Sequence, residues 1–233
     1  MSDMSPESQL TRLVEVIDRS VRETGFTDRR CLFATTLVMH FAERLGFEVM
    51  RWEGSTIWYN RKYVELKDSG YDFNKLAQLP KDKREKRLDA LEKKGMRTLH
   101  CMANEGDPET DLGGHLCVIA RMNDACFFID PTAFQFQRLP DPPLRPGQIE
   151  TPEFIVAPME ATDTSEINFL YRYRGGVGVY LHAPVNRYRA MLELADDDPG
   201  RRGLNPCRFP DLYQTLERAL SLKPMNNITE EGQ

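Results

Sequence analysis

The chain lacks the features that mark extracellular and membrane proteins. It has only five cysteines, an odd number with no CxxC pair, which argues against a disulfide framework and favours reduced thiols. Its longest apolar runs are a few residues, far below the length of a membrane span. The opening MSDMSPESQL does not follow the basic and then apolar order of a secretory signal. We therefore expect a cytoplasmic protein that does not engage a membrane.

An excess of positive charge is also missing. The chain has 31 basic and 36 acidic residues, a net charge of -5, and this gives no general electrostatic reason to bind nucleic acid. The segment YRYRGGVGVYLHAPVNRYRA interleaves aromatic and basic residues, as some nucleic-acid surfaces do. A hairpin with one aromatic face and one arginine face explains the same alternation. We expect a peptide or a small-molecule amide as the partner, and the oligomeric state stays open.

What the chain does contain is typical of a globular protein. Hydrophobic residues make up 40% and charged residues 29% of its 233 residues, a balance found in folded domains. This length suffices for one large domain or two small ones. We predict a single domain over residues 1–222 and a flexible tail over 223–233.

The first part of the chain predicts two helices. Residues 7–24 carry apolar side chains at spacings of three and four, which indicates an amphipathic helix that Gly25 closes. A second helix can begin after a cap at Thr27 or Asp28 and end before Gly46. Its broad apolar face is typical of a buried central helix. The apolar positions are Leu10, Leu13, Val14, Ile17 and Val21 in the first helix and Phe33, Leu37, Val38, Phe41 and Leu45 in the second.

The rest of the chain is dominated by strand patterns. FEVMRW, the turn EGS and TIWYN predict a hairpin, residues 61–79 give mixed signals, and 81–95 indicate a solvated helix. Later strands are expected at 115–121, 126–130, FIVAP, INFLYRYR and VGVYLHAP, then loop at 195–210 and a helix near 210–222. RLPDPPLRPG marks a further loop. Helices followed by mostly antiparallel strands predict an α+β fold.

A histidine and an aspartate lie on two strands that a tight turn joins. If residues 123 and 124 form a two-residue loop, Cys117 opposes Asp130 across the antiparallel pair. His115 and Asp130 then share a face as diagonal neighbours, about 7–8 Å apart at the backbone. A carboxylate that accepts from one ring nitrogen leaves the other nitrogen to take a proton. This register predicts an acid–base pair.

Cys31 is the candidate nucleophile. It lies in the first turn of the second helix, where free backbone amides and the positive end of the helix dipole favour a thiolate. Arg29 and Arg30 precede it and add positive charge. Cys117 and Cys126 lie in apolar strands, where desolvation disfavours the thiolate.

Three segments carry a resemblance to a known superfamily. RRCLFATTLVMHFAERLGFEV, GGHLCVIA and CFFIDPTAFQF place a cysteine at a helix start, a histidine on a strand after Gly-Gly and an aspartate at the end of the next strand. This order resembles the transglutaminase-like branch of the papain-like cysteine superfamily and, more distantly, the arylamine N-acetyltransferases. The resemblance covers roughly residues 25–136. It implies a transglutaminase-like core with Cys31 as nucleophile, His115 as general base and acid, and Asp130 as the orienting carboxylate.

The same residues allow other interpretations. His115, Cys117, Cys126 and Asp130 are types that coordinate zinc, but in this register we expect them to be strung along the ribbon, and we predict no metal or cofactor. Asn60, Tyr59 or Gln135 could supply an oxyanion donor, although a hydrogen-bonded strand end explains them as well. We interpret the remaining histidines and cysteines as structural or incidental: His40, His100, His182, Cys101 and Cys207.

The function expected from these observations is acyl transfer at a cysteine. Cys31 would attack an amide, ester or thioester carbonyl, and the acyl group would pass to water or to an amine. Hydrolysis of an amide, as in a thiol protease, is our first hypothesis, and acyl transfer from a coenzyme A thioester is a variant of it. The alternative is a non-catalytic binding or scaffold protein in which the same three residues pack and form hydrogen bonds.

Overall fold

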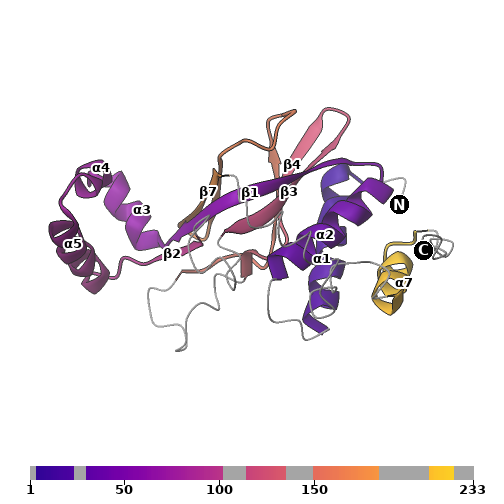
Figure 1. Cartoon of the computed structure of the whole chain (residues 1–233), viewed down its shortest axis with the longest axis horizontal. Helices are drawn as coiled ribbons and strands as arrows, with labels where there is room; N and C mark the ends of the chain where they lie inside the picture. Colours follow the sequence, from indigo (N-terminus) through magenta and orange to yellow (C-terminus); the bar gives the residue numbers. More distant parts are fainter. Residues whose placement is uncertain (1–3, 24–29, 102–113, 135–148, 184–209, 223–233) are drawn as a thin grey trace, which may run out of the picture.

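The computed structural model describes residues 4–23, 30–101, 114–134, 149–183 and 210–222. Over these residues the fold is α+β, as predicted, with helices packed on a curled antiparallel sheet that forms a half-barrel. Figure 1 shows α1, α2 and α7 at one end of the molecule and α3, α4 and α5 at the other.

The sheet has seven strands in the order β5-β4-β3-β1-β7-β6, with β2 also paired to β1. Every pairing is antiparallel. The strands are β1 Glu48–Tyr59, β2 Thr98–Cys101, β3 His115–Met122, β4 Ala125–Asp130, β5 Ile155–Met159, β6 Phe169–Tyr173 and β7 Gly176–His182. The strands predicted from FIVAP, INFLYRYR and VGVYLHAP are thereby confirmed.

The predicted hairpin at FEVMRW and TIWYN is wrong, because β1 runs through Glu53, Gly54 and Ser55 without a turn. One edge of β1 pairs first with β3, up to Gly54, and then with β2, from Thr56 onward. The other edge pairs with β7 from Gly54 onward. A Cβ at position 54 would lie 2.2 Å from the carbonyl oxygen of Leu181. The glycine therefore permits a close backbone approach instead of a turn.

Three helices cover one face of β1, β3 and β4. They are α1 Pro6–Glu23, α2 Arg30–Arg44 and α7 Pro210–Ala219, close to the three helices expected from the sequence. Alternate strand residues such as Val118 and Ile129 meet α2 there, and α2 is buried on several sides as its broad apolar face predicts. The helical core positions are Leu10, Leu13, Val14, Ile17, Phe33, Leu37, Val38, Phe41 and Leu216.

The opposite face of the sheet encloses a second core, rich in aromatic side chains. Trp52 and Trp58 are fully buried and meet the ring of Tyr180 edge to face, at 5.8 and 6.4 Å between centroids. Phe128 also packs edge to face on Trp52, at 5.6 Å. These residues lie inside the curl of the sheet. The buried polar residues His115 and Asp130 lie in the same core, next to Tyr180.

The third group of helices follows β1 directly. It comprises α3 Arg61–Asp68, α4 Phe73–Ala77 and α5 Lys81–Lys93. The solvated helix predicted at 81–95 is confirmed, since Leu91 alone is buried along α5. The mixed signals of 61–79 resolve into α3 and α4, which Asn60 and Asp72 cap with their side chains. No helix within the described ranges is long and apolar enough to cross a membrane.

Several predictions fall outside the described residues. They concern Gly25, the cap at Thr27 or Asp28, the RLPDPPLRPG loop, the loop before Pro210 and the tail over 223–233.

Candidate functional site

His115 and Asp130 form a direct pair inside the second core. The Nε2 atom of His115 lies 2.9 Å from Oδ2 of Asp130, and both side chains are fully buried. This is the contact between the two side chains that the sequence predicts. A buried charged group needs such a partner, because its desolvation is costly when it stands alone.

The register of the strands explains the pair. Asn123, with φ of 53°, begins a two-residue turn, and β3 pairs with β4 from Met122 opposite Ala125 to Val118 opposite Ile129. Continuing this ladder places Cys117 opposite Asp130, as predicted. The pairing of Gly54 with His115 turns the histidine toward the face that carries Trp52 and Trp58.

Asp130 accepts two further hydrogen bonds. The hydroxyl of Tyr180 on β7 donates to Oδ2 at 2.8 Å, and the backbone N–H of Thr132 donates to Oδ1 at 2.9 Å. The bond from the Thr132 N–H closes a turn of the kind that an aspartate before a proline commonly begins. Asp130 thus contacts His115 with one oxygen and begins the Asp-Pro turn with the other.

The electrostatics of the pair favour a charged imidazole. Burial, the largest effect, would lower the pKa of His115, but the charge of the adjacent Asp130 carboxylate, followed by Cys117 and the hydrogen bond to Asp130, outweighs it and holds that pKa well above 6.5. Burial, with the Asp130 charge next in size, raises the pKa of the Tyr180 hydroxyl well above its ordinary value. Tyr180 therefore stays a neutral donor to the carboxylate.

Cys117 lies closer to the pair than expected. Ligand-type atoms of His115, Cys117 and Asp130 all lie within 4.8 Å of one another. The expectation that the candidate zinc ligands are strung along the ribbon is therefore wrong for these three, because the register places Cys117 opposite Asp130 and His115 on the same face. It holds for Cys126, which pairs with Arg121 farther along the ladder and is outside this group.

These three residues are also the ones that could hold a metal ion. Binding would require the Cys117 thiol to lose its proton, and burial raises the pKa of that thiol, with the Asp130 charge adding to the effect. It would also compete with the three hydrogen bonds that Asp130 accepts. The three side chains are of types that bind a soft divalent ion. The hydrogen bonds in the structure, however, match a protonated His115 that donates to Asp130.

Cys31 is placed at the start of α2, as the sequence predicts. It is buried, with 7% of its surface exposed. Thr35, one turn later on the same helix face, donates from its hydroxyl to the carbonyl oxygen of Leu116 at 3.3 Å. This contact directs the first turn of α2 toward the start of β3, beside His115. The Cys31 thiol also contributes to the raised pKa of Cys117.

Cys101 is a neighbour of the site that the sequence reading treated as structural. It ends β2 opposite Thr56, two positions from the place where β1 pairs with His115. Its Sγ lies 2.9 Å from the carbonyl oxygen of Gly114. Burial is the main reason that the pKa of its thiol is raised, and the nearby His115 opposes this effect. The thiols of Cys101 and Cys117 therefore both lie close enough to the imidazole to interact with it electrostatically.

The candidate oxyanion donors have structural roles where they are described. The Asn60 side chain accepts from the N–H groups of Tyr63 and Arg97 and donates to the carbonyl of Gly95. Tyr59 stacks on Tyr63 at 3.8 Å between ring centroids. The remaining candidate, Gln135, and the incidental thiol of Cys207 lie outside the described residues.

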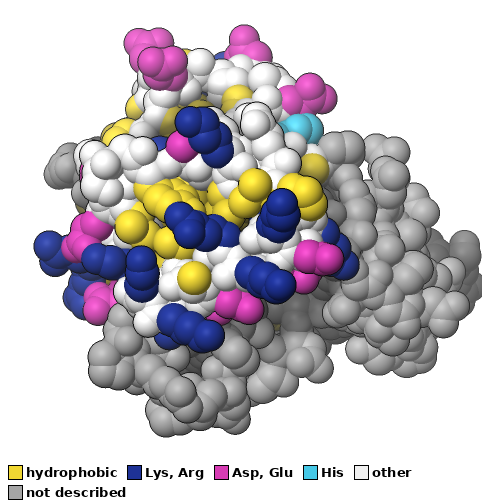
Figure 2. Space-filling view, turned by 90° about the vertical axis from the view of Figure 1, so that its left-hand side faces the viewer, with side chains coloured by type: hydrophobic (Ala, Val, Ile, Leu, Met, Phe, Trp, Pro, Cys, Tyr) yellow, Lys and Arg dark blue, Asp and Glu magenta, His cyan; other side chains and the backbone are white. Residues whose placement is uncertain are grey.

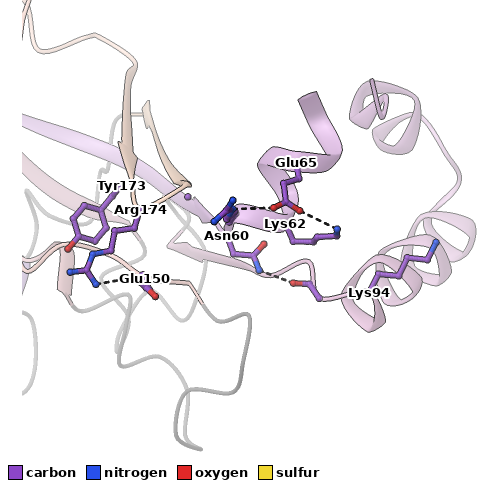
Figure 3. A pocket seen from close by; sticks show the side chains of 10 residues that line it. Asn60, Lys62, Glu65, Lys94, Glu150, Tyr173 and Arg174 are labelled. Atoms are coloured by element: carbon purple, nitrogen blue, oxygen red, sulfur yellow. Dashed lines mark hydrogen bonds and ion pairs between the residues drawn. The ribbon is translucent and has the colours of Figure 1, made fainter. Parts of the chain in front are cut away.

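A polar pocket of about 450 Å³ lies near the far end of β1. Figure 3 shows two ion pairs among its charged side chains, Lys62 with Glu65 and Arg174 with Glu150. It begins at Asn60, six residues from the position of β1 that pairs with His115, or about 20 Å along an extended strand. The pocket is therefore separate from the His115–Asp130 pair.

The arrangement as a whole defines an α+β protein with a buried imidazole–carboxylate pair and a cysteine at a nearby helix start. Comparison with known proteins adds no relative: no family model, no curated protein and no solved structure matches the chain.

Proposed function

We propose that the protein is a cysteine-dependent hydrolase or acyltransferase with a transglutaminase-like core and a triad of Cys31, His115 and Asp130. The observation that carries the proposal is the buried contact of 2.9 Å between His115 Nε2 and Asp130 Oδ2, at the strand end where α2 begins. Its substrate would be a peptide or a small-molecule amide, ester or thioester.

The chemistry follows from the placement of the groups. Asp130 holds Nε2, so His115 would exchange protons through Nδ1. In its charged form His115 already holds the thiol proton, and the Cys31 sulfur attacks the carbonyl carbon. The imidazolium then protonates the leaving amine as the carbon–nitrogen bond breaks. Water attacks the resulting thioester, His115 takes its proton, and the thiol is restored as the acid departs.

Cys117 is the competing nucleophile, because it forms a hydrogen bond with His115. Two observations disfavour it. It is fully buried in the aromatic core, and burial raises the pKa of its thiol. A reactive cysteine needs both a thiolate and access. Cys117 therefore serves as the matched control for Cys31.

The test is alkylation of the native protein by iodoacetamide, with the adducts located by peptide mass spectrometry. We expect Cys31 to be labelled first, and Cys31→Ser to abolish this fast phase while Cys117→Ser preserves it. His115→Gln should slow the labelling of Cys31 by a factor of about 10 or more, since general base assistance contributes at least that much. Circular dichroism confirms that each variant is folded.

Two results would reject the proposal. One is equal labelling of Cys31 in the native protein and in folded His115→Gln, and the other is preferential labelling of Cys101 or Cys117. Incubation with acetyl-coenzyme A distinguishes an acyltransferase that uses coenzyme A thioesters from a hydrolase. Only the acyltransferase is expected to carry an acetyl group from this donor on Cys31.

A non-catalytic binding or scaffold role is the second candidate. The observation in its favour is the complete burial of His115 and Asp130 and the use of both carboxylate oxygens in hydrogen bonds. Such a network can fix β7 against β4 without chemistry. In that case His115→Gln would lower the stability and leave every thiol labelling rate unchanged.

A further inference from the structure

An apolar groove of about 440 Å³ lies on the side of β1 that faces away from the aromatic core, where α3, α4 and α5 meet the sheet. Its floor includes Ile57 and Tyr59 of β1, and its walls are built from the three helices. Arg84 is the single charged residue among the described lining residues. The lining is Ile57, Tyr59, Tyr63, Phe73, Leu76, Ala77, Arg84, Leu88, Met96 and Thr98.

The groove is aromatic and incompletely covered. Tyr63 stacks on Tyr59, and Phe73 packs on Tyr63 at 4.4 Å between centroids. Tyr59, Tyr63 and Phe73 each remain half-buried. Burial is also the main cause that raises the pKa of the Tyr59 hydroxyl to about 12. Apolar grooves of this kind receive the apolar face of amphipathic peptides in known complexes.

The helices around the groove carry a local excess of positive charge. Residues 61–97 include twelve basic and seven acidic side chains, a net of +5, while the whole chain carries -5. Three of those acids are already paired within the same helices or caps: Glu65 with Lys62, Asp72 with Lys75 and Glu85 with Lys81. Figure 2 shows hydrophobic side chains gathered in the middle of this face, with Lys and Arg around them and Asp and Glu interspersed.

We propose that this groove binds an acidic amphipathic segment of a partner protein. Apolar side chains of the segment would fill the groove, and its carboxylates would meet the basic rim. The charge of the rim, opposite in sign to that of the chain as a whole, selects an acidic partner. The site goes beyond the proposed function, because it lies on the reverse face of β1 from His115 and needs none of the triad residues.

The shape of the surface favours a peptide over a membrane. Insertion into a bilayer requires apolar side chains that protrude, whereas this surface is concave and accepts them. Among the described residues, three large apolar side chains are strongly exposed, and Leu79 is the one in the α3–α5 region. Basic residues around a recess instead match the helix-in-groove mode of peptide recognition.

The test is fluorescence anisotropy of a labelled acidic peptide with Leu and Trp at helical spacing and Glu elsewhere. Two control peptides replace either every Glu with Lys or every Leu and Trp with Ser. We expect the full-length protein to bind the acidic amphipathic peptide at least tenfold more tightly than either control. Its affinity should weaken as salt is raised, because exposed charges are screened.

Variants locate the binding. Ala77→Glu puts a charge into the groove at an exposed lining position, and Arg84→Glu reverses the charge of the wall. Each should weaken binding about tenfold or more, a difference of about 1.4 kcal/mol. Lys93→Glu is the matched control, since it reverses an exposed charge on the same helix outside the lining. It should change the affinity by less than about twofold.

Four results would overturn the proposal. They are absence of binding up to about 1 mM peptide, equal binding of the Ser-substituted peptide, no effect of Ala77→Glu, and a dimer by light scattering that Ala77→Glu dissociates. Binding to phosphatidylserine vesicles that exceeds binding to the peptide, and that Arg84→Glu abolishes, would assign the surface to a membrane instead. None of these outcomes depends on whether Cys31, His115 and Asp130 are catalytic.

Discussion

The two halves of β1 lie in contrasting surroundings. From Glu48 to Gly54 the strand is flanked by β3, with Trp52 sealed among aromatic rings on one face and the α1–α2 core on the other. From Ser55 to Tyr59 one face still contacts the aromatic core through Trp58, while the other lies under the loosely covering helices α3–α5. One strand thus connects a densely packed interior, suited to a preorganised site, with a charged and open surface, suited to recognition.

The largest loss of stability is expected for a substitution in the aromatic core. Trp52→Ala should lower the free energy of unfolding by about 3–5 kcal/mol, because it leaves a cavity and removes the indole hydrogen bond to Ile167. Leu88→Ala, at a half-buried site in α5, should cost about 1 kcal/mol. Urea denaturation measures both. Equal losses would mean that the two regions are packed alike.

The next effect concerns the junction between the two halves. Gly54→Ala should cost about 1–3 kcal/mol, because its methyl group meets the carbonyl of Leu181 and forces β7 away from β1. The displacement should also disturb the hydrogen bond from Tyr180 to Asp130. Thermal unfolding and the chemical shift of the His115 ring report on the two effects. A stable variant with an unchanged His115 signal would contradict this role for the glycine.

The base of the helical extension depends on one side chain. Asn60→Ala removes the cap of α3 and the bonds to Gly95 and Arg97, and should cost about 1–2 kcal/mol. Amide hydrogen exchange should accelerate in α3–α5 and stay unchanged in β3 and β4. Acceleration throughout the sheet would show that the two regions unfold as a single unit.

The pH dependence of stability should trace to the interior. The pKa of His115 is raised above 6.5 in the folded state by Asp130. Its stabilisation is therefore complete below about pH 6.5 and is lost as the pH rises through the folded value. Urea denaturation between about pH 6 and pH 9 should show a downward slope that is smaller in His115→Gln. Identical slopes would remove His115 as the cause.

The smallest change in stability is expected for a substitution on the basic surface of α5. Lys86→Glu reverses an exposed charge on α5 and should change stability by less than about 0.5 kcal/mol. Thermal unfolding checks this expectation. A large loss would indicate that the charges of α5 support the fold.

Patterns that are local in sequence gave correct predictions. The helices near 7–24 and 210–222 follow from apolar spacing, and the hairpin of β3 and β4 follows from a two-residue turn. Because both residues lie on this hairpin, the contact between His115 and Asp130 could be derived without the rest of the chain. The caps at Asn60 and Asp72 were equally local signals for α3 and α4, although they were missed.

Features that depend on distant pairings could not be predicted. E-G-S looks like a turn in sequence, but β3, β2 and β7 pair along both edges of β1 and hold it extended. Tyr180 reaches Asp130 only because β7 pairs with β1, more than a hundred residues earlier in the chain. Cys117, by contrast, approaches Asp130 through the local register of β3 and β4.

The most direct test of the central claim is acylation of the native protein by p-nitrophenyl acetate, followed by intact-mass and peptide-mass analysis. We expect one acetyl group, located on Cys31, that forms in Cys117→Ser and is absent in Cys31→Ser. An acetyl group that appears unchanged in Cys31→Ser, or a native protein that is never acetylated, would contradict the claim.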